Sequence, residues 1–141
     1  MALLFYYDKE ITNMLKKRIK YEDFNGDERE EDFYFNLNKS ELLKWDLSTA
    51  GGLETLIKKI IDTKDIAKLL EIFEEIIDKA YGERSADGKQ FIKSKELVEA
   101  FKQTNAYDNM FMEFMQNPDE YAKFIKAIIP SDIAKELKET N

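Results

Sequence analysis

The chain of 141 residues contains neither cysteine nor histidine. The lack of cysteine excludes disulfides, thiolate nucleophiles, zinc fingers and iron–sulfur clusters. The lack of histidine removes the commonest general base and the commonest transition-metal ligand. Neither a Ser-His-Asp nor a Cys-His catalytic arrangement can therefore be built from this chain. We predict that the protein is not an enzyme and that it binds no cofactor and no metal ion.

Glycine and proline are also scarce, with five and two residues respectively, which excludes collagen-like and low-complexity chains. No apolar run approaches the roughly 20 residues that a membrane-spanning helix requires. The run Ala-Leu-Leu-Phe-Tyr-Tyr at residues 2–7 is short, and no basic region precedes it, so it is a poor signal peptide. These absences predict a cytoplasmic protein that has no membrane partner.

The composition that remains is typical of an acidic globular protein. Apolar residues make up 43% of the chain, which argues against intrinsic disorder. The net charge of −7 repels nucleic acid rather than attracting it. The length fits one domain. We expect that domain to cover residues 1–141, with residues 1–13 as a candidate N-terminal extension, a β-hairpin over residues 14–37 and a helical bundle over residues 38–139.

Residues 15–37 alternate as two β-strands do, on either side of Asn25-Gly26. A two-residue loop would place the apolar residues of the two strands on opposite faces of the hairpin. A three-residue loop, Phe24-Asn25-Gly26, avoids this and lets Gly26 adopt the left-handed conformation. It pairs a basic strand with an acidic one, and the predicted pairs are Leu15–Phe35, Arg18–Asp32 and Lys20–Glu30. We expect the helices to bury Phe33, Phe35 and Leu37.

From residue 38 onward the apolar residues recur with the 3.6-residue period of amphipathic helices. Cap residues divide this pattern into about six helices. The expected caps are Asn38 with Glu41, Ser94, Thr104 and Asn117, which Pro118 follows. The predicted fold class is therefore α+β and mainly α, with an N-terminal antiparallel β-hairpin packed on a bundle of about six helices.

The segment around Gly82 receives three predictions. Gly82 follows a long apolar stripe, in the position of a left-handed C-cap. A polar loop is predicted over residues 83–89, and Phe91-Ile92 is expected to form a short extended piece.

After Pro130, Ser131 is the expected cap of a last, frayed helix that ends at Leu137.

The loop at residues 83–94 superficially resembles a calcium-binding loop. If Gly88 occupies the obligatory glycine position, then Glu83, Ser85 and Asp87 supply the first ligands, but Ser94 stands where a bidentate glutamate is needed. We therefore predict an ordinary Asp-Gly turn here.

The run Met110-Phe111-Met112-Glu113-Phe114-Met115 is the candidate binding surface of the chain. Its apolar residues spread more than halfway around a helix, which a helix buried on two sides would also explain. Methionine adapts to irregular apolar surfaces and is frequent at promiscuous binding sites. The candidate partner-binding residues are therefore Met110, Phe111, Met112, Phe114 and Met115. Among the three methionines, Met112 is expected to be the least buried.

Several blocks of the sequence together resemble the tail assembly chaperones of long-tailed, siphovirus-type phages. The first block runs from Asp32-Phe33-Tyr34-Phe35 into Lys39-Ser40-Glu41-Leu42. The blocks that follow, in the same order, are residues 51–54, 80–85 and 87–94, then Phe101 with Thr104, residues 106–107 and 111–113, and finally residues 124–130. The resemblance covers residues 14–130, and residues 1–13 fall outside it.

The resemblance implies a non-enzymatic assembly factor with no catalytic residues. Such chaperones hold the long tape measure protein in a soluble state while tail tube subunits are recruited and polymerise around it, in the cytoplasm of the bacterial host. The implied partners are the tape measure protein and the tail tube protein, and a homo-oligomer is a further candidate. The alternative is a phage structural or connector protein that is retained in the virion.

Overall fold

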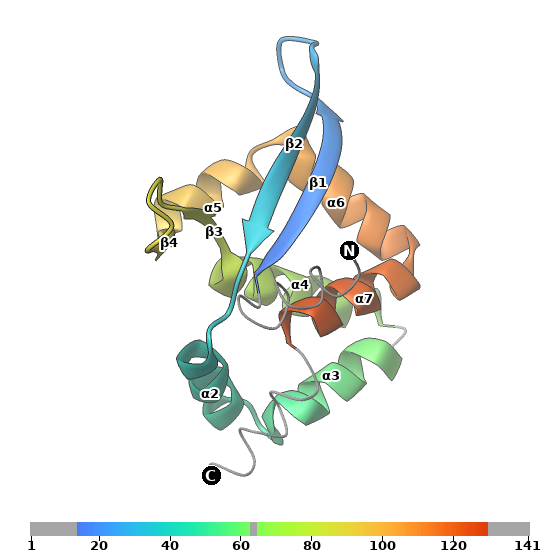
Figure 1. Ribbon diagram of the computed structural model, residues 1–141. Helices are drawn as coiled ribbons and strands as arrows, with labels where there is room; N and C mark the ends of the chain where they lie inside the picture. The colour runs from blue at the N-terminus through green and yellow to red at the C-terminus, as the bar shows by residue number, and fades with distance from the viewer. Residues whose placement is uncertain (1–13, 63–64, 130–141) are drawn as a thin grey trace, which may run out of the picture.

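The computed structural model describes residues 14–62 and 65–129. Two strands lead into helices, and two shorter strands interrupt the helices after the third of them (Figure 1). This arrangement confirms the predicted α+β, mainly helical fold with an N-terminal hairpin. The elements are β1 (Leu15–Glu22), β2 (Glu28–Phe35), α2 (Lys39–Ser48), α3 (Gly52–Asp62), α4 (Ile66–Ala80), β3 (Tyr81–Arg84), β4 (Phe91–Ile92), α5 (Lys95–Lys102), α6 (Asn105–Gln116) and α7 (Pro118–Ile128).

The β1–β2 hairpin has the predicted three-residue loop. Leu15 lies opposite Phe35, and the register continues through Arg18–Asp32 and Lys20–Glu30. At the tip, the Asp23 N–H donates to the Asp27 carbonyl at 2.8 Å, and the Gly26 N–H donates to the Asp23 carbonyl at 3.0 Å. Gly26 has φ +84°, a conformation that side chains with a Cβ rarely adopt. The register prediction is confirmed.

The sheet contains more than the predicted hairpin. Its strand order is β1-β2-β3-β4, and β3 is joined to β2 by the two pairs Tyr34–Gly82 and Phe35–Tyr81. Beyond Gly82, β3 leaves β2 and pairs with β4 instead. Glu83 and Arg84 therefore belong to a strand. The sequence pattern predicts them as the first two residues of the loop over residues 83–89, and this part of the prediction was wrong.

Gly82 is not the helix cap that the sequence predicts. Helix α4 ends at Ala80, and its C-cap is Tyr81 in an extended conformation. A Cβ built on Gly82 would lie 2.5 Å from the Ile92 carbonyl oxygen and 2.6 Å from the Phe91 ring. The glycine is needed because β4 approaches the backbone closely, not because the chain turns to the left-handed region.

The core lies where the inner face of the hairpin meets the helices. Phe35 and Leu37 are buried as predicted, and Phe33 is half-buried against the same cluster. The rings of Phe124 on α7 and Phe101 on α5 lie 5.2 and 6.0 Å from the Phe35 ring. The other buried apolar side chains of α7 are Tyr121, Ile125 and Ile128, followed by Ile129, and their spacing is that of an amphipathic helix.

Most of the predicted helix starts are confirmed. Asn38 and Glu41 form a capping box at α2, and the hydroxyls of Ser94 and Thr104 accept from the third backbone N–H of α5 and α6. Asn117 makes no side-chain cap bond, although Pro118 is the first residue of α7. The predicted helix from Ser131 to Leu137 lies outside the described residues, as does the apolar run at residues 2–7.

Candidate partner-binding surface

Helix α6 carries the five residues that the sequence predicts as a partner-binding surface. It begins after Thr104, whose hydroxyl accepts from the Tyr107 N–H at 3.2 Å. It ends at Gln116, one residue before the Asn117-Pro118 start of α7. The helix packs against β1, α5 and α7 (Figure 1), and the face that carries Asp108, Met112 and Gln116 stays exposed.

The structure divides the five candidate residues between the core and the surface. Met110 and Phe114 are fully or nearly fully buried, and both belong to the core. Phe111 and Met115 are partly buried against that core. Met112 is 44% exposed, and it is the least buried of the three methionines, as predicted. A partner that meets the folded protein can therefore touch Met112 and the exposed parts of Phe111 and Met115.

The two phenylalanines of the run anchor α6 to its neighbours. The Phe114 ring lies 4.8 Å from the Phe124 ring and 5.7 Å from the Tyr121 ring, both on α7. The Phe111 ring meets Phe73 of α4 edge to face at 5.7 Å. Such aromatic pairs add about 0.5–1.5 kcal/mol to the effect of burial alone. The main role of Phe114 in the isolated fold is therefore structural.

A polar stripe on the same helix binds the edge of β1. The side-chain amides of Asn105 and Asn109 donate to the carbonyls of Glu22 and Lys20 at 2.8 and 3.0 Å. At position 113, which continues the spacing of 105 and 109, Glu113 forms an ion pair with Lys17 at 3.3 Å. Sequence reasoning missed these contacts because the partners are more than 80 residues apart in the chain.

The spacing of the stripe matches the strand that it covers. Four residues of an α-helix rise about 6.0 Å, and two residues of a β-strand rise about 6.7 Å. Asn105 and Asn109 can therefore each reach one of the outward-facing carbonyls of β1, which recur at every second residue. The signal available in the sequence was the repetition of polar residues at positions 105, 109 and 113, on a helix whose other faces are apolar.

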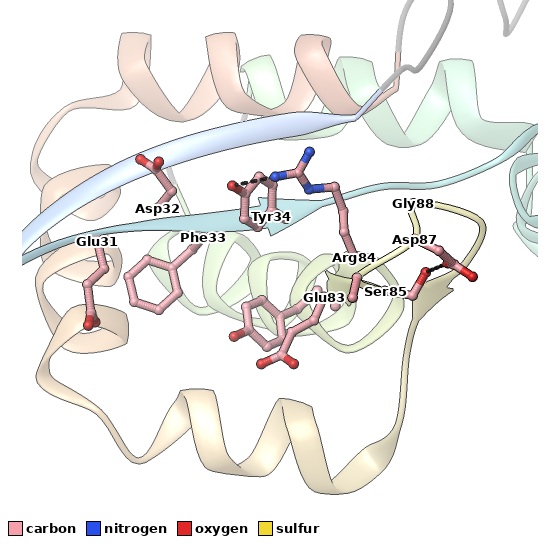
Figure 2. A pocket seen from close by; sticks show the side chains of 12 residues that line it. Glu31, Asp32, Phe33, Tyr34, Glu83, Arg84, Ser85, Asp87 and Gly88 are labelled. Carbon is pink, nitrogen blue, oxygen red and sulfur yellow. Dashed lines mark hydrogen bonds between the residues drawn. The ribbon is translucent and has the colours of Figure 1, made fainter.

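A second surface feature is a cavity of about 740 Å³ beside β2, at the point where β3 turns away. Its walls are residues 31–34 of β2, residues 81–84 of β3 and the turn at residues 85–88. Figure 2 shows Glu31 and Phe33 on one side of β2 and Asp32 on the other, with Glu83 facing the opening from β3. The Arg84 guanidinium lies over the Tyr34 ring at 4.7 Å and donates to its hydroxyl at 3.2 Å.

Carboxylates outnumber cations around this cavity. Among the described residues that line it, the carboxylates are those of Glu31, Asp32, Glu83 and Asp87, and the only cation is Arg84. The Glu31 carboxylate accepts a hydrogen bond from the Tyr21 hydroxyl, and this bond raises the pKa of Tyr21. Burial raises the pKa of Tyr81 to about 12, so the hydroxyl of this lining residue stays protonated at neutral pH.

The turn at residues 85–90 closes on itself. The Ser85 hydroxyl donates to the Asp87 carboxylate at 2.7 Å, and the Lys89 N–H donates to the same oxygen at 3.0 Å. These two bonds, the Ser85 bond first, lower the pKa of Asp87. Over residues 14–62 and 65–129, no cluster of three or more acidic side chains is close enough to hold a metal ion. The predicted absence of calcium binding stays a prediction.

Several large apolar side chains outside α6 are also exposed. Phe24 stands at the hairpin tip, Leu47 near the end of α2, Ile66 at the start of α4 and Ile92 on β4. These four residues belong to different parts of the chain, and none of them lies on α6 with Met112. Of the helices in the described part of the chain, none combines the length and the apolarity that a membrane span requires.

The described molecule is a small, mainly helical α+β protein that offers apolar side chains and an acidic cavity on its surface. It belongs to a family of phage tail assembly chaperones, because the family model with the description "Phage tail assembly chaperone" matches residues 14–141. This finding confirms the resemblance seen in the sequence. A chaperone family is typically non-enzymatic. Neither a curated protein nor a solved structure matches the chain.

Proposed function

We propose that this protein keeps the tape measure protein of a long-tailed phage soluble, and helps to recruit tail tube subunits, while the tail assembles in the host cytoplasm. The observation that carries the proposal is the family membership over residues 14–141. A tail assembly chaperone must bind at least one tail protein before the tail is complete. The tape measure protein is the partner that the resemblance implies, because it is long and has to remain unassembled until the tube surrounds it.

Two physical properties of the chain support this role. Its net charge of −7 would keep a complex with an apolar helical protein in solution. The exposed part of α6 around Met112 is apolar and adaptable. We therefore propose Met112, with the accessible edges of Phe111 and Met115, as the partner contact. Met110 and Phe114 would support this contact from the core rather than touch the partner.

Co-expression with the tape measure protein of the same phage tests the proposal. We expect the wild-type protein to keep the tape measure protein soluble and to co-purify with it. Met112→Asp should abolish co-purification, because a carboxylate in an apolar contact must be desolvated without a partner. The thermal transition of the isolated variant should stay close to that of the wild type, since the side chain at position 112 is exposed.

Leu47→Asp is the matched control. Leu47 is an apolar helix residue that is 66% exposed, and it lies on α2 rather than α6. The Leu47→Asp variant introduces the same charge as Met112→Asp and should leave co-purification intact. If both variants fail equally, added negative charge rather than the α6 surface explains the loss. A wild-type protein that leaves the tape measure protein insoluble would contradict the proposed function.

The alternative role, a structural or connector protein retained in the particle, predicts a different composition of the virion. Mass spectrometry of purified virions should detect a retained subunit and should not detect a chaperone. Adding the tail tube protein to the co-expression tests recruitment, because a tube subunit that joins the complex should co-purify with it. Light scattering of the isolated protein measures whether it works as a monomer or as a homo-oligomer.

A further inference from the structure

Among residues 14–62 and 65–129, no strand pairs with one edge of β2 along most of its length, and we refer to this as the open edge. Asp23 and Asp27 form a hydrogen-bonded pair, and such pairs recur at every second residue of an antiparallel hairpin. The backbone N–H and C=O groups of the odd-numbered residues of β2 therefore point toward β1, and those of the even-numbered residues point away from it. Tyr34 uses its outward groups in the pair with Gly82. No backbone hydrogen bond to the outward N–H and C=O groups of Glu28, Glu30 and Asp32 is found among the described residues.

The edge is open because β3 leaves it early. After Gly82, β3 pairs with β4 through Glu83–Ile92 and Arg84–Phe91. The cavity of about 740 Å³ lies between β2 and the diverging part of β3 (Figure 2). The opposite edge of the hairpin is covered by α6, because the side-chain amides of Asn105 and Asn109 donate to the outward carbonyls of β1. An unpaired row of backbone donors and acceptors is a template for an added strand.

The side chains along this edge select the charge of such a strand. Glu28, Glu30 and Asp32 alternate on one face of β2. Glu30 and Asp32 share the single Arg18 guanidinium, at 2.9 and 3.1 Å. Within the described part of the chain, neither Glu28 nor Glu83 forms an ion pair. Glu83 lines the cavity from β3 and is exposed.

We propose that the open edge of β2 binds an extended basic segment of another protein, which adds as a strand and places a lysine or arginine at every second position beside Glu28, Glu30 and Asp32. A second copy of this chain does not fit the edge, because two β2 strands would bring their carboxylates face to face, and like charges directly opposite are destabilising. This proposal does not depend on the solubilisation of the tape measure protein. It concerns a surface separate from α6.

A peptide of alternating lysine and threonine, acetylated and amidated, is the probe. Residues that pair directly with Glu30 carry their side chains on the same face of the sheet, so its lysines would meet the carboxylates. We expect amide hydrogen exchange at Glu28, Glu30 and Asp32 to slow by about tenfold or more when the peptide is bound. A matched peptide of alternating glutamate and threonine should give no protection. The lysine–threonine peptide methylated at its lysine amide nitrogens should also fail, because it keeps the charge and loses the strand donors.

Two variants at one position separate the backbone from the charge. Glu30→Thr removes the carboxylate and keeps the outward N–H, whereas Glu30→Pro removes both. Proline is tolerated on an edge when its missing N–H faces solvent, so the β1–β2 ladder should persist in Glu30→Pro. We expect Glu30→Pro to bind the peptide about tenfold more weakly than Glu30→Thr. Glu99→Lys, which reverses an exposed charge on α5, controls for long-range attraction.

Each outcome decides the proposal. Protection limited to the β2 edge, together with loss of binding for the methylated peptide, supports it. Equal binding of the methylated and unmethylated peptides would overturn it in favour of charge attraction without strand addition. Concentration-dependent dimerisation that protects the same amides would also overturn it, because the occupant would then be a second copy. If Glu30→Pro does not fold, the comparison of the two peptides on the wild-type protein decides the question alone.

Discussion

The two ends of the β1–β2 hairpin each carry a phenylalanine, Phe35 at the base and Phe24 at the tip, in opposite environments. At the base, Phe35 is 0% exposed and lies among the rings of Tyr81, Phe101 and Phe124. At the tip, Phe24 is 80% exposed, and the hairpin projects beyond α5 and α6 (Figure 1). The base is held by tertiary packing. The tip is held by local hydrogen bonds around Asp23.

The local bonds at the tip form a compact network. The Asp23 carboxylate accepts from the Asn25 and Asp27 N–H groups at 2.9 and 3.0 Å, and from the Arg29 guanidinium at 2.6 Å. The Arg29 bond, followed by the bond from Asp27, holds the pKa of Asp23 below its ordinary value. The comparison shows that the hairpin depends on the helices at one end and on its own turn at the other. Stability should therefore fall steeply when a buried ring is removed at the base and hardly at all when the exposed Phe24 ring is removed at the tip.

The largest effect is expected at the base. Phe35→Ala should lower the free energy of unfolding by about 3–5 kcal/mol, because it leaves a cavity among the aromatic rings. Denaturant unfolding measures this loss. Tyr34→Ala is the control, since Tyr34 is the neighbouring aromatic residue on the opposite face of β2 and is only half-buried. A loss below about 1 kcal/mol for Phe35→Ala would mean that the base does not depend on core packing.

The next effect is expected where β3 joins the base. Gly82→Ala should cost about 1–3 kcal/mol, because the new Cβ forces the Ile92 carbonyl and the Phe91 ring to move. Gly88→Asn is a suitable control. Position 88 has φ +74° with open space around it, and asparagine tolerates that conformation. Equal losses in the two variants would show that the close approach of β4 is not what selects glycine at position 82.

A smaller effect is expected along the middle of the hairpin. Asn109→Asp replaces the amide that donates to the Lys20 carbonyl with a carboxylate that cannot donate. The two residues have similar helix propensities, so the expected loss of about 1 kcal/mol reports on the hydrogen bond. Gln116→Glu makes the same chemical change at an exposed position on α6 and should cost less. If Asn109→Asp is no worse than this control, α6 does not hold the edge of β1 through this bond.

The sequence predicted the parts of the fold that depend on local rules. The hairpin register followed from the alternation of apolar residues, which only the three-residue loop places on one face. The caps at Asn38, Ser94 and Thr104 followed from side-chain chemistry near each helix start. Strand β3 was missed because its four residues, Tyr-Gly-Glu-Arg, follow a helix directly and are half polar. It is a strand because β2 and β4 lie on either side of it, and a local reading of the sequence contains neither neighbour.

The candidate surface was predictable only in part, for a similar reason. Helical periodicity separated the exposed Met112 from the buried Met110. It could not show that Phe114 would be enclosed by α7, because that requires the path of the chain after Asn117. The open edge of β2 was also invisible in the sequence. It depends on β3 turning toward β4 after Gly82, which is a property of the sheet and not of any one segment.

The smallest effect is expected at the tip. Phe24→Ser should change the free energy of unfolding by less than about 0.5 kcal/mol, since the ring is almost fully exposed and leaves no cavity. The turn should keep its geometry because the bonds to Asp23 come from Asn25, Asp27 and Arg29, not from residue 24. Phe33→Ser is the matched control, because its half-buried ring lies 5.1 Å from Phe101 and its loss should be clearly larger. A cost above about 1 kcal/mol for Phe24→Ser would contradict the contrast between base and tip, because an exposed ring has little burial energy to lose.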